Sequence, residues 1–123
     1  MTDRTRWRTA VLLGCVAVLA GCGATDPPRA TDGTDATACR YGSCQIRVDG
    51  SAGFGVETPA YGIDRVHVTV AHSTVTVRGT APGTEVENTL SGNGSRGQLN
   101  NLGVRVDWVD GAVGVLTFTP TTP

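Results

Sequence analysis

Apolar and polar residues alternate along much of the second half of the chain, and this alternation predicts β-strands. From Cys44 to Asp49, the side chains of Cys44, Ile46 and Val48 fall on one face and polar side chains fall on the other. A period of two residues is typical of a strand with one buried side and one wet side. We therefore expect folded structure to begin near this segment.

The next alternating segments predict a hairpin. Valine occupies alternate positions in two segments: Val66, Val68 and Val70 within Ile63–Val70, and Val75 and Val77 within Thr74–Arg78. His72 and Ser73 lie between the two segments. A two-residue loop at His72–Ser73 pairs Val70 with Val75, so that the valines of both strands share a face. A slip of one residue would expose all of them, so the register is well specified. Such a loop favours positive φ, where His is one of the enriched residues.

A second hairpin is predicted near the end of the chain. Val104–Val109 and Ala112–Phe118 flank Asp110–Gly111, which is a strong two-residue turn signal. Both faces then carry apolar residues, which indicates a central strand pair or a bulge near Gly114. One face holds Val104, Val106, Trp108, Val113 and Val115, and the other holds Val109, Leu116 and Phe118.

The remaining segments are less regular. Ala52–Gly62 is a glycine-rich loop in which we expect Phe54 and Val56 to fill the core or form a short edge strand, with Tyr61 covering it. Thr84–Leu90 fits one helical turn or a strand, and its poor helix formers favour the strand. Ser91–Asn101 is rich in Gly and Asn and is predicted to be an exposed, mobile loop.

These segments together predict an all-β domain over residues 38–120. Five to seven short strands are separated by Gly, Pro and Asn turns, and no segment has a convincing helical pattern. We expect a small antiparallel β-sandwich or a partly open barrel.

The N-terminus has a different pattern. Arg4, Arg6 and Arg8 precede an uninterrupted run of apolar or small residues, Ala10–Ala20. A basic stretch, a short apolar stretch and small residues in that order form a secretory signal peptide, here over residues 1–21. The apolar run is shorter than the 18 or more residues that indicate a membrane-spanning helix.

The signal ends in Leu19, Ala20, Gly21 and Cys22. All four positions match the lipobox, so the chain resembles bacterial lipoproteins, and loosely the small uncharacterised lipoproteins of actinobacteria. The resemblance implies a diacylglyceryl group on the Cys22 thiol, cleavage before Cys22 and attachment to the extracytoplasmic face of the cell membrane. Two acyl chains anchor stably where one does not. The alternative is a secreted protein with a chance cysteine at the cleavage site.

Residues 22–37 are predicted to be a lipidated, disordered tether. They include Pro27 and Pro28 and no large apolar side chain, so this stretch buries too little surface to offset its ordering entropy. A flexible chain of this length spans roughly 20 Å.

The charge of the chain disfavours nucleic acid as a partner. Residues 1–21 carry three Arg and one Asp, so the remaining 102 residues have seven basic and ten acidic side chains, a formal charge of −3. Nucleic-acid binding usually shows as a basic patch or stripe. The partners expected from the sequence are membrane lipid through Cys22 and a protein or cell-wall component of the envelope.

Cysteine use agrees with an oxidising compartment. Beyond Cys15 in the signal and Cys22, the chain has the pair Cys39 and Cys44. We expect a disulfide, which for so short a loop contributes roughly 2 kcal/mol. Two thiols without other ligands make a poor metal site, and their spacing is not Cys-x-x-Cys.

No catalytic motif or cofactor motif is found. His67 and His72 are expected on the surface, and Ser73 beside His72 lacks the Gly-x-Ser-x-Gly elbow of a hydrolase. Tyr61 and Trp108 would form a carbohydrate or peptide contact if both were exposed side by side. The sequence thus favours a non-enzymatic interaction module at the envelope, with a small-ligand or carbohydrate-binding module as the alternative.

Overall fold

A computed structural model describes residues 26–57 and 61–121 of the chain. Within these ranges the chain forms eight strands and one short 3₁₀ helix, η2, and no α-helix. The predicted signal peptide and Cys22 lie outside the described residues. The elements are η2 (Ala36–Cys39), β1 (Cys44–Asp49), β2 (Ser51–Gly55), β3 (Arg65–Ala71), β4 (Thr74–Ala81), β5 (Thr84–Ser91), β6 (Arg96–Leu99), β7 (Leu102–Asp110) and β8 (Val113–Pro120).

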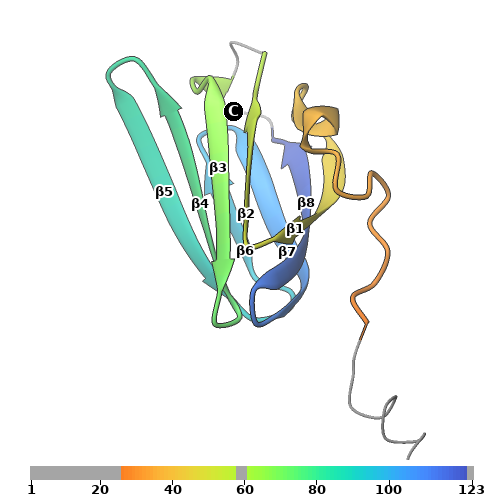
Figure 1. Cartoon of the computed structure of the whole chain (residues 1–123). Coiled ribbons are helices and arrows are strands. Elements are labelled where there is room, and N and C mark those ends of the chain that lie inside the picture. The colour runs from red at the N-terminus through yellow and green to blue at the C-terminus, as the bar shows by residue number, and fades with distance from the viewer. Residues whose placement is uncertain (1–25, 58–60, 122–123) are drawn as a thin grey trace, which may run out of the picture.

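The strands form two antiparallel four-stranded sheets (Figure 1). Sheet A has the order β1-β8-β7-β6 and sheet B the order β2-β3-β4-β5. The chain passes from sheet A to sheet B at Gly50 and returns between β5 and β6. Around the molecule the strands therefore follow their order in the chain, but hydrogen bonding does not run continuously through the two corners. The prediction of a small all-β sandwich is confirmed, and the sheets do not close into a barrel.

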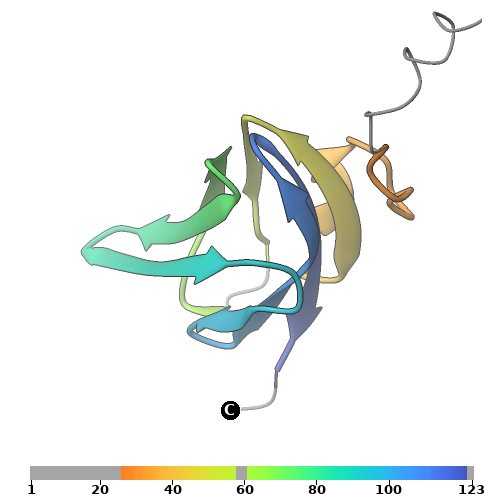
Figure 2. The same ribbon diagram turned by 90° about the horizontal axis from the view of Figure 1, so that it is seen from below.

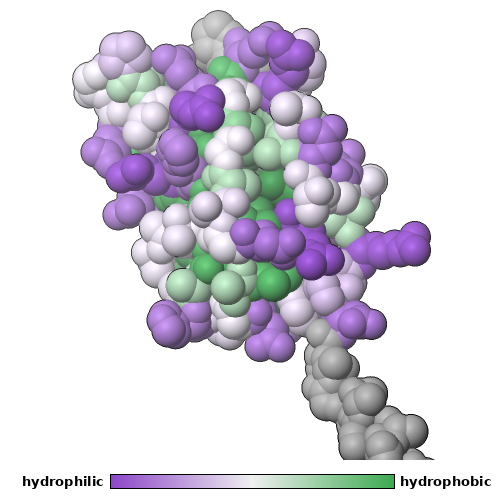
Figure 3. All heavy atoms as spheres, in the orientation of Figure 1, coloured by the Kyte–Doolittle hydropathy of each residue, from purple (hydrophilic) through white to green (hydrophobic). Residues whose placement is uncertain are grey.

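The hydrophobic core lies between the two sheets. Phe54 of β2 and Phe118 of β8 meet across it with ring centroids 5.2 Å apart in an edge-to-face arrangement. The valines of β3 and β4 fill the rest of the core from sheet B, and every buried side chain in the described ranges is apolar, apart from the Tyr61 hydroxyl. Figure 3, in the orientation of Figure 1, shows hydrophobic residues in the middle of the face between hydrophilic ones.

The β3–β4 hairpin confirms the predicted register. Val70 pairs with Val75 and Val68 with Val77, with His72 and Ser73 as the two loop residues. Both loop residues have positive φ, 52° and 58°. This turn also contacts the β7–β8 turn, because the Ser73 amide donates to the Gly111 carbonyl over 2.8 Å.

The predicted register of the β7–β8 hairpin is wrong by one residue. Asp110 pairs with Val113, so the loop residues are Gly111 and Ala112, and the bulge lies at Asp107 rather than near Gly114. One extra residue in β7 shifts the phase of the alternation. As a result Val104, Val106, Val109, Leu116 and Phe118 all belong to the core.

The structure also settles the irregular segments. Thr84–Ser91 is a strand, as favoured, and Phe54 lies in a short edge strand. The predicted mobile loop over 91–101 is wrong in part, since it contains β6, which pairs with β7. A Cβ atom at Gly97 of β6 would lie 3.0 Å from the Leu90 side chain. Glycine therefore serves here for the close approach of β5 to β6, not for a flexible loop.

The described part of the predicted tether is also not entirely free, which corrects the boundary at residue 38. The Asp32 amide donates to the Gln45 carbonyl over 2.9 Å, and the Arg47 amide donates to the Gly33 carbonyl over 2.8 Å. These bonds cover the outer edge of β1. Unpaired strand edges can associate with strands of other molecules, and here residues 32 and 33 occupy part of the β1 edge.

The described part of the chain contains no helix with the length and apolar character needed to cross a bilayer. Figure 2, seen from below, shows the two sheets facing each other, and in both ribbon views the β4–β5 hairpin leans away from the rest of the molecule.

Candidate functional site

The predicted disulfide is present and closes a short loop at one end of the sandwich. Cys39 at the end of η2 and Cys44 at the start of β1 are bonded, with their Cα atoms 5.0 Å apart. The helix before it is capped by Asp35, whose carboxylate accepts a hydrogen bond from the Thr37 amide over 3.1 Å. We call residues Cys39–Cys44 the disulfide loop.

Tyr61 packs against the disulfide loop and forms a hydrogen bond with it. Its side chain is buried, and its hydroxyl donates to the Tyr41 carbonyl over 3.0 Å. Gly42 has φ of +87°, and a Cβ atom there would lie 2.1 Å from the Tyr61 hydroxyl oxygen. Tyr61 therefore covers the core, as expected, and packs directly on the loop. A buried ring in this position is a structural support and does not offer a face to a ligand.

The disulfide loop presents Tyr41 to solvent. Its side chain is 64% exposed, and no other large hydrophobic side chain of the described residues is exposed. The Arg40 guanidinium lies 5.6 Å from the Tyr41 ring centroid and forms an ion pair with Glu57. The hydrogen bond from this ion pair raises the pKa of Arg40 above its ordinary value. The result is an aromatic ring and a fixed cation side by side on a cross-linked loop.

Trp108 lies on the outer face of sheet A and not in the core. The bulge at Asp107 turns it outward, opposite Val115 of β8. Val115 is only 1% exposed although it is not part of the core, and its other cross-strand neighbour is Arg47. The Trp108 side chain is half-buried, and it lies beside Val115 on the outer face. With Tyr61 buried, the predicted exposed pair of Tyr61 and Trp108 does not form.

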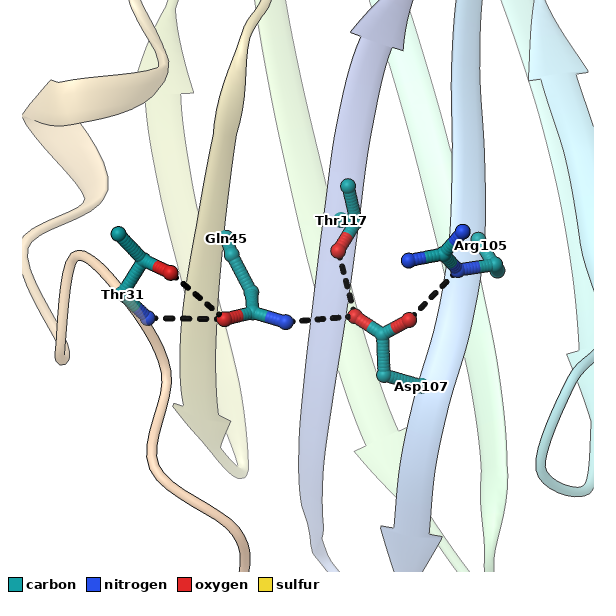
Figure 4. Close-up of polar contacts among 5 residues, drawn as sticks. All are labelled: Thr31, Gln45, Arg105, Asp107 and Thr117. Carbon is teal, nitrogen blue, oxygen red and sulfur yellow. Dashed lines mark hydrogen bonds and ion pairs between the residues drawn. The ribbon is translucent and has the colours of Figure 1, made fainter.

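Asp107 is the centre of a polar network on the outer face of sheet A (Figure 4). Its carboxylate accepts hydrogen bonds from the Thr117 hydroxyl, from Gln45 Nε2 over 3.1 Å and from Arg105 Nε over 2.6 Å. Gln45 Oε1 in turn accepts from the Thr31 amide over 2.8 Å. The network thus joins β7, β8 and β1 to the segment that precedes η2.

The surroundings of Asp107 shift its pKa in two opposing directions. Partial burial acts to raise the pKa of this carboxyl, but the hydrogen bonds from Thr117, Gln45 and Arg105, with the charge of Arg105, lower it, and the net pKa lies below its ordinary value of 3.8. A depressed pKa in the folded state contributes stability above the unfolded-state pKa. That contribution is lost as the pH falls below about 3.8 through the folded-state pKa.

We expect Asp107→Ala to lower the free energy of unfolding at pH 7 by about 1–3 kcal/mol, because Gln45 and Thr117 lose the acceptor that they share. The difference from the unsubstituted protein should shrink as the pH falls below 3.8 toward the lowered pKa of Asp107 in the folded state. Urea unfolding at several pH values measures both effects. Asp110→Ala, at the exposed end of the same strand, is the control and should change stability by less than about 0.5 kcal/mol. Equal effects of the two substitutions would contradict this account.

A polar groove lies beside this network, over β6, β7 and the end of β8. It encloses about 360 Å³. Gly103 lines it, and a Cβ atom there would lie 3.1 Å from Thr121 Cγ2 and 3.2 Å from the Thr119 carbonyl oxygen. A second hollow of about 360 Å³ adjoins it on the side of β1 and shares Thr117 and Thr119 with it. The lining side chains of the polar groove include Arg96, Gln98, Arg105, Thr117, Thr119 and Thr121.

The histidines lie where the sequence places them. His67 is exposed and pairs across the strands with Arg78, and His72 is in the β3–β4 turn. Within residues 26–57 and 61–121, no three His, Cys, Asp or Glu side chains gather in a way that could hold a metal ion.

Comparison of the chain with protein-family models, with curated proteins and with solved structures found no match.

Sequence reasoning missed the Asp107 network and the polar groove. Arg105 and Asp107 are two residues apart on a predicted strand, which is a signal for an ion pair on one face. Arg96 and Gly97 gave no such signal, because their segment has the composition of a loop.

Proposed function

We propose that this protein is a lipid-anchored protein of the extracytoplasmic face of the cell membrane, and that its β-sandwich is a non-enzymatic interaction module for an envelope protein or a cell-wall component. The observation that carries the proposal is the disulfide between Cys39 and Cys44 in a domain that follows the Leu19–Cys22 tetrapeptide. Disulfides form and persist outside the reducing cytosol. The lipobox resemblance and the cross-linked loop thus support the same compartment independently.

The attachment of residues 31–33 to β1 supports a domain held close to a membrane. In Figure 1 the described chain begins at the lower end of the molecule, level with the β3–β4 and β7–β8 turns, and the disulfide loop lies at the upper end. Eight residues separate Cys22 from Thr31, which is bonded to Gln45. Fully extended, that distance is at most about 30 Å. An anchor at Cys22 would therefore keep the domain within about 30 Å of the lipid surface, attached on the β1 side of sheet A.

Tyr41 and Arg40 support a protein partner. Tyrosine and arginine are enriched among the residues that dominate protein–protein binding energy. A loop closed by a disulfide and supported by Tyr61 loses little conformational entropy on binding, which favours affinity. We therefore place the protein contact of this module at the disulfide loop.

The anchor is tested by metabolic labelling with a fatty-acid analogue in cells that express the full chain. The unsubstituted protein should take up label and fractionate with membranes, and Cys22→Ala should do neither. Cys15→Ala, within the apolar run, is the matched control and should label normally. Uptake of label by Cys22→Ala would overturn the proposal of anchoring through this thiol.

The contact surface is tested by a photo-crosslinking amino acid placed at position 41 of the anchored protein in its own cells. Because Tyr41 is exposed and Gly83 lies in the distant β4–β5 turn, the same probe at position 83 is the control. We expect a discrete adduct from position 41 at a yield at least several-fold above that from position 83. Equal adducts, or none from position 41, would contradict a protein contact at the disulfide loop.

The alternative, a ligand-binding module, is favoured by one observation, the polar groove on sheet A. Its hydroxyl, amide and guanidinium groups are suited to a polar ligand, and its volume lies at the lower end of the range for small-molecule sites.

A further inference from the structure

The polar groove offers several hydrogen-bond donors that have no partner among the described residues, most of them on arginine. The guanidinium of Arg96 makes no hydrogen bond or ion pair within the described ranges, and Arg105 uses only its Nε, on Asp107. The Thr119 hydroxyl is also without a partner there, and the Thr121 hydroxyl accepts from Gln98 and retains its proton. The Thr117 hydroxyl donates its hydrogen bond to Asp107 and, like Gln98 Oε1, can only accept from a ligand. A ligand that fills this groove must therefore supply acceptors for the arginines, and its hydroxyl groups can donate to these two oxygens.

The two arginines also leave a positive charge without compensation. Arg96 of β6 and Arg105 of β7 are direct cross-strand partners. Side chains in such pairs begin about 5 Å apart, and like charges directly opposite each other destabilise a sheet. Asp107 compensates Arg105 and fixes its orientation, but no carboxylate pairs with Arg96 within residues 26–57 and 61–121. An anion between the two guanidinium groups would relieve this repulsion.

Gly103 lets Thr121 pack close to β7 at the edge of the groove. Gly103 stands opposite Gln98, and a Cβ atom there would lie 3.1 Å from Thr121 Cγ2 and 3.2 Å from the Thr119 carbonyl oxygen. This packing and the hydrogen bond from Gln98 hold the Thr121 hydroxyl beside the two arginines that line the groove. Arginine is suited to binding a phosphate anion, because its planar donors match phosphate oxygens in pairs.

We propose that the polar groove binds the phosphate group of a phosphorylated sugar or polyol. Arg96 and Arg105 hold the phosphate oxygens, and the hydroxyls of Thr119 and Thr121 hydrogen-bond to the hydroxyl-bearing part of the ligand. The inference rests on the proposed function in one respect, that the domain is an extracytoplasmic binding module. It assigns to sheet A a site separate from the disulfide loop, and it needs no chemical step.

The test is a titration of the full chain in detergent micelles, followed by NMR of the arginine Nε–H and threonine signals. Three probes are compared: glycerol 1-phosphate, inorganic phosphate and glycerol. We expect glycerol 1-phosphate to shift the signals of Arg96, Arg105 and Thr119 in a saturable way. Arg96→Gln should weaken its binding at least tenfold, whereas Arg78→Gln, which removes an exposed arginine from sheet B, should leave binding unchanged.

Each outcome bears on the proposal. Equal affinity for inorganic phosphate would support an oxyanion site and reject the polyol part of the ligand. Binding of glycerol alone as tightly as glycerol 1-phosphate would overturn the role of charge. Equal loss in Arg96→Gln and Arg78→Gln would show a general charge effect and overturn the site. No saturable shift with any of the three probes would also overturn it. These results are independent of Cys22 labelling and of crosslinking at position 41, so the failure of either proposal can be recognised separately.

Discussion

Replacing Phe118 with Ala is expected to lower the free energy of unfolding by about 3–5 kcal/mol. Phe118 is 1% exposed, and its ring lies 5.2 Å from the ring of Phe54. The pair joins β8 of sheet A to β2 of sheet B, so the substitution leaves a cavity between the two layers. A domain of this size is stable by about 5–10 kcal/mol in total, and the loss is a large fraction of it.

Chemical unfolding in urea, followed by circular dichroism, measures this loss. Tyr41→Ala is the matched control, because it truncates an aromatic side chain that is 64% exposed. We expect it to change stability by less than about 0.5 kcal/mol. A loss for Phe118→Ala as small as that of the control would contradict the placement of Phe118 between the sheets.

Gly42→Ala is expected to cost about 3–4 kcal/mol although it adds a single methyl group. An alanine with positive φ costs about 1–2 kcal/mol by itself. The new Cβ would in addition lie 2.1 Å from the Tyr61 hydroxyl oxygen, so the buried ring must move. Its displacement removes a hydrogen bond worth about 1 kcal/mol and exposes part of a large apolar surface.

Two variants separate these contributions. Gly92→Ala has nearly the same φ, +84°, but its Cβ would meet nothing within 4 Å, so it should cost only the backbone part, about 1–2 kcal/mol. In the double variant Gly42→Ala/Tyr61→Ala the clash is absent. Its loss of stability should therefore be smaller than the sum of the losses of Gly42→Ala and Tyr61→Ala. Thermal unfolding of the unsubstituted protein, of Gly42→Ala, Gly92→Ala and Tyr61→Ala, and of the double variant measures this. Equal losses for Gly42→Ala and Gly92→Ala would show that Tyr61 does not pack on the disulfide loop.

Local patterns were sufficient for the β3–β4 hairpin. Every second residue there is a valine, the loop has two residues, and only one register places all the valines inward. A one-residue error would be costly for this sequence, so the pattern leaves one solution. The disulfide was predictable for a similar reason, because five positions separate its two cysteines and few other partners remain.

The β7–β8 hairpin shows why the same reasoning failed nearby. Both of its faces carry apolar residues, so the alternation does not fix which face is buried. The bulge at Asp107 resolves the conflict, and it is stabilised by partners on β8 and β1. Strands distant in the sequence supply those partners, and no local pattern contains them. The same bulge moves Trp108 to the outer face, and Asp107 holds Arg105 and Thr117, which line the polar groove.

The sequence by itself determined the all-β character of the domain, the β3–β4 register and the Cys39–Cys44 bond, because these depend on neighbours within a few residues. Only the tertiary structure decided that Tyr61 supports the disulfide loop, that residues 31–33 cover the edge of β1, and that Arg96 faces Arg105. Each of these contacts involves at least one segment whose own composition resembles a loop. Their positions depend on how the two sheets meet, which is decided by burial of the whole apolar surface at once.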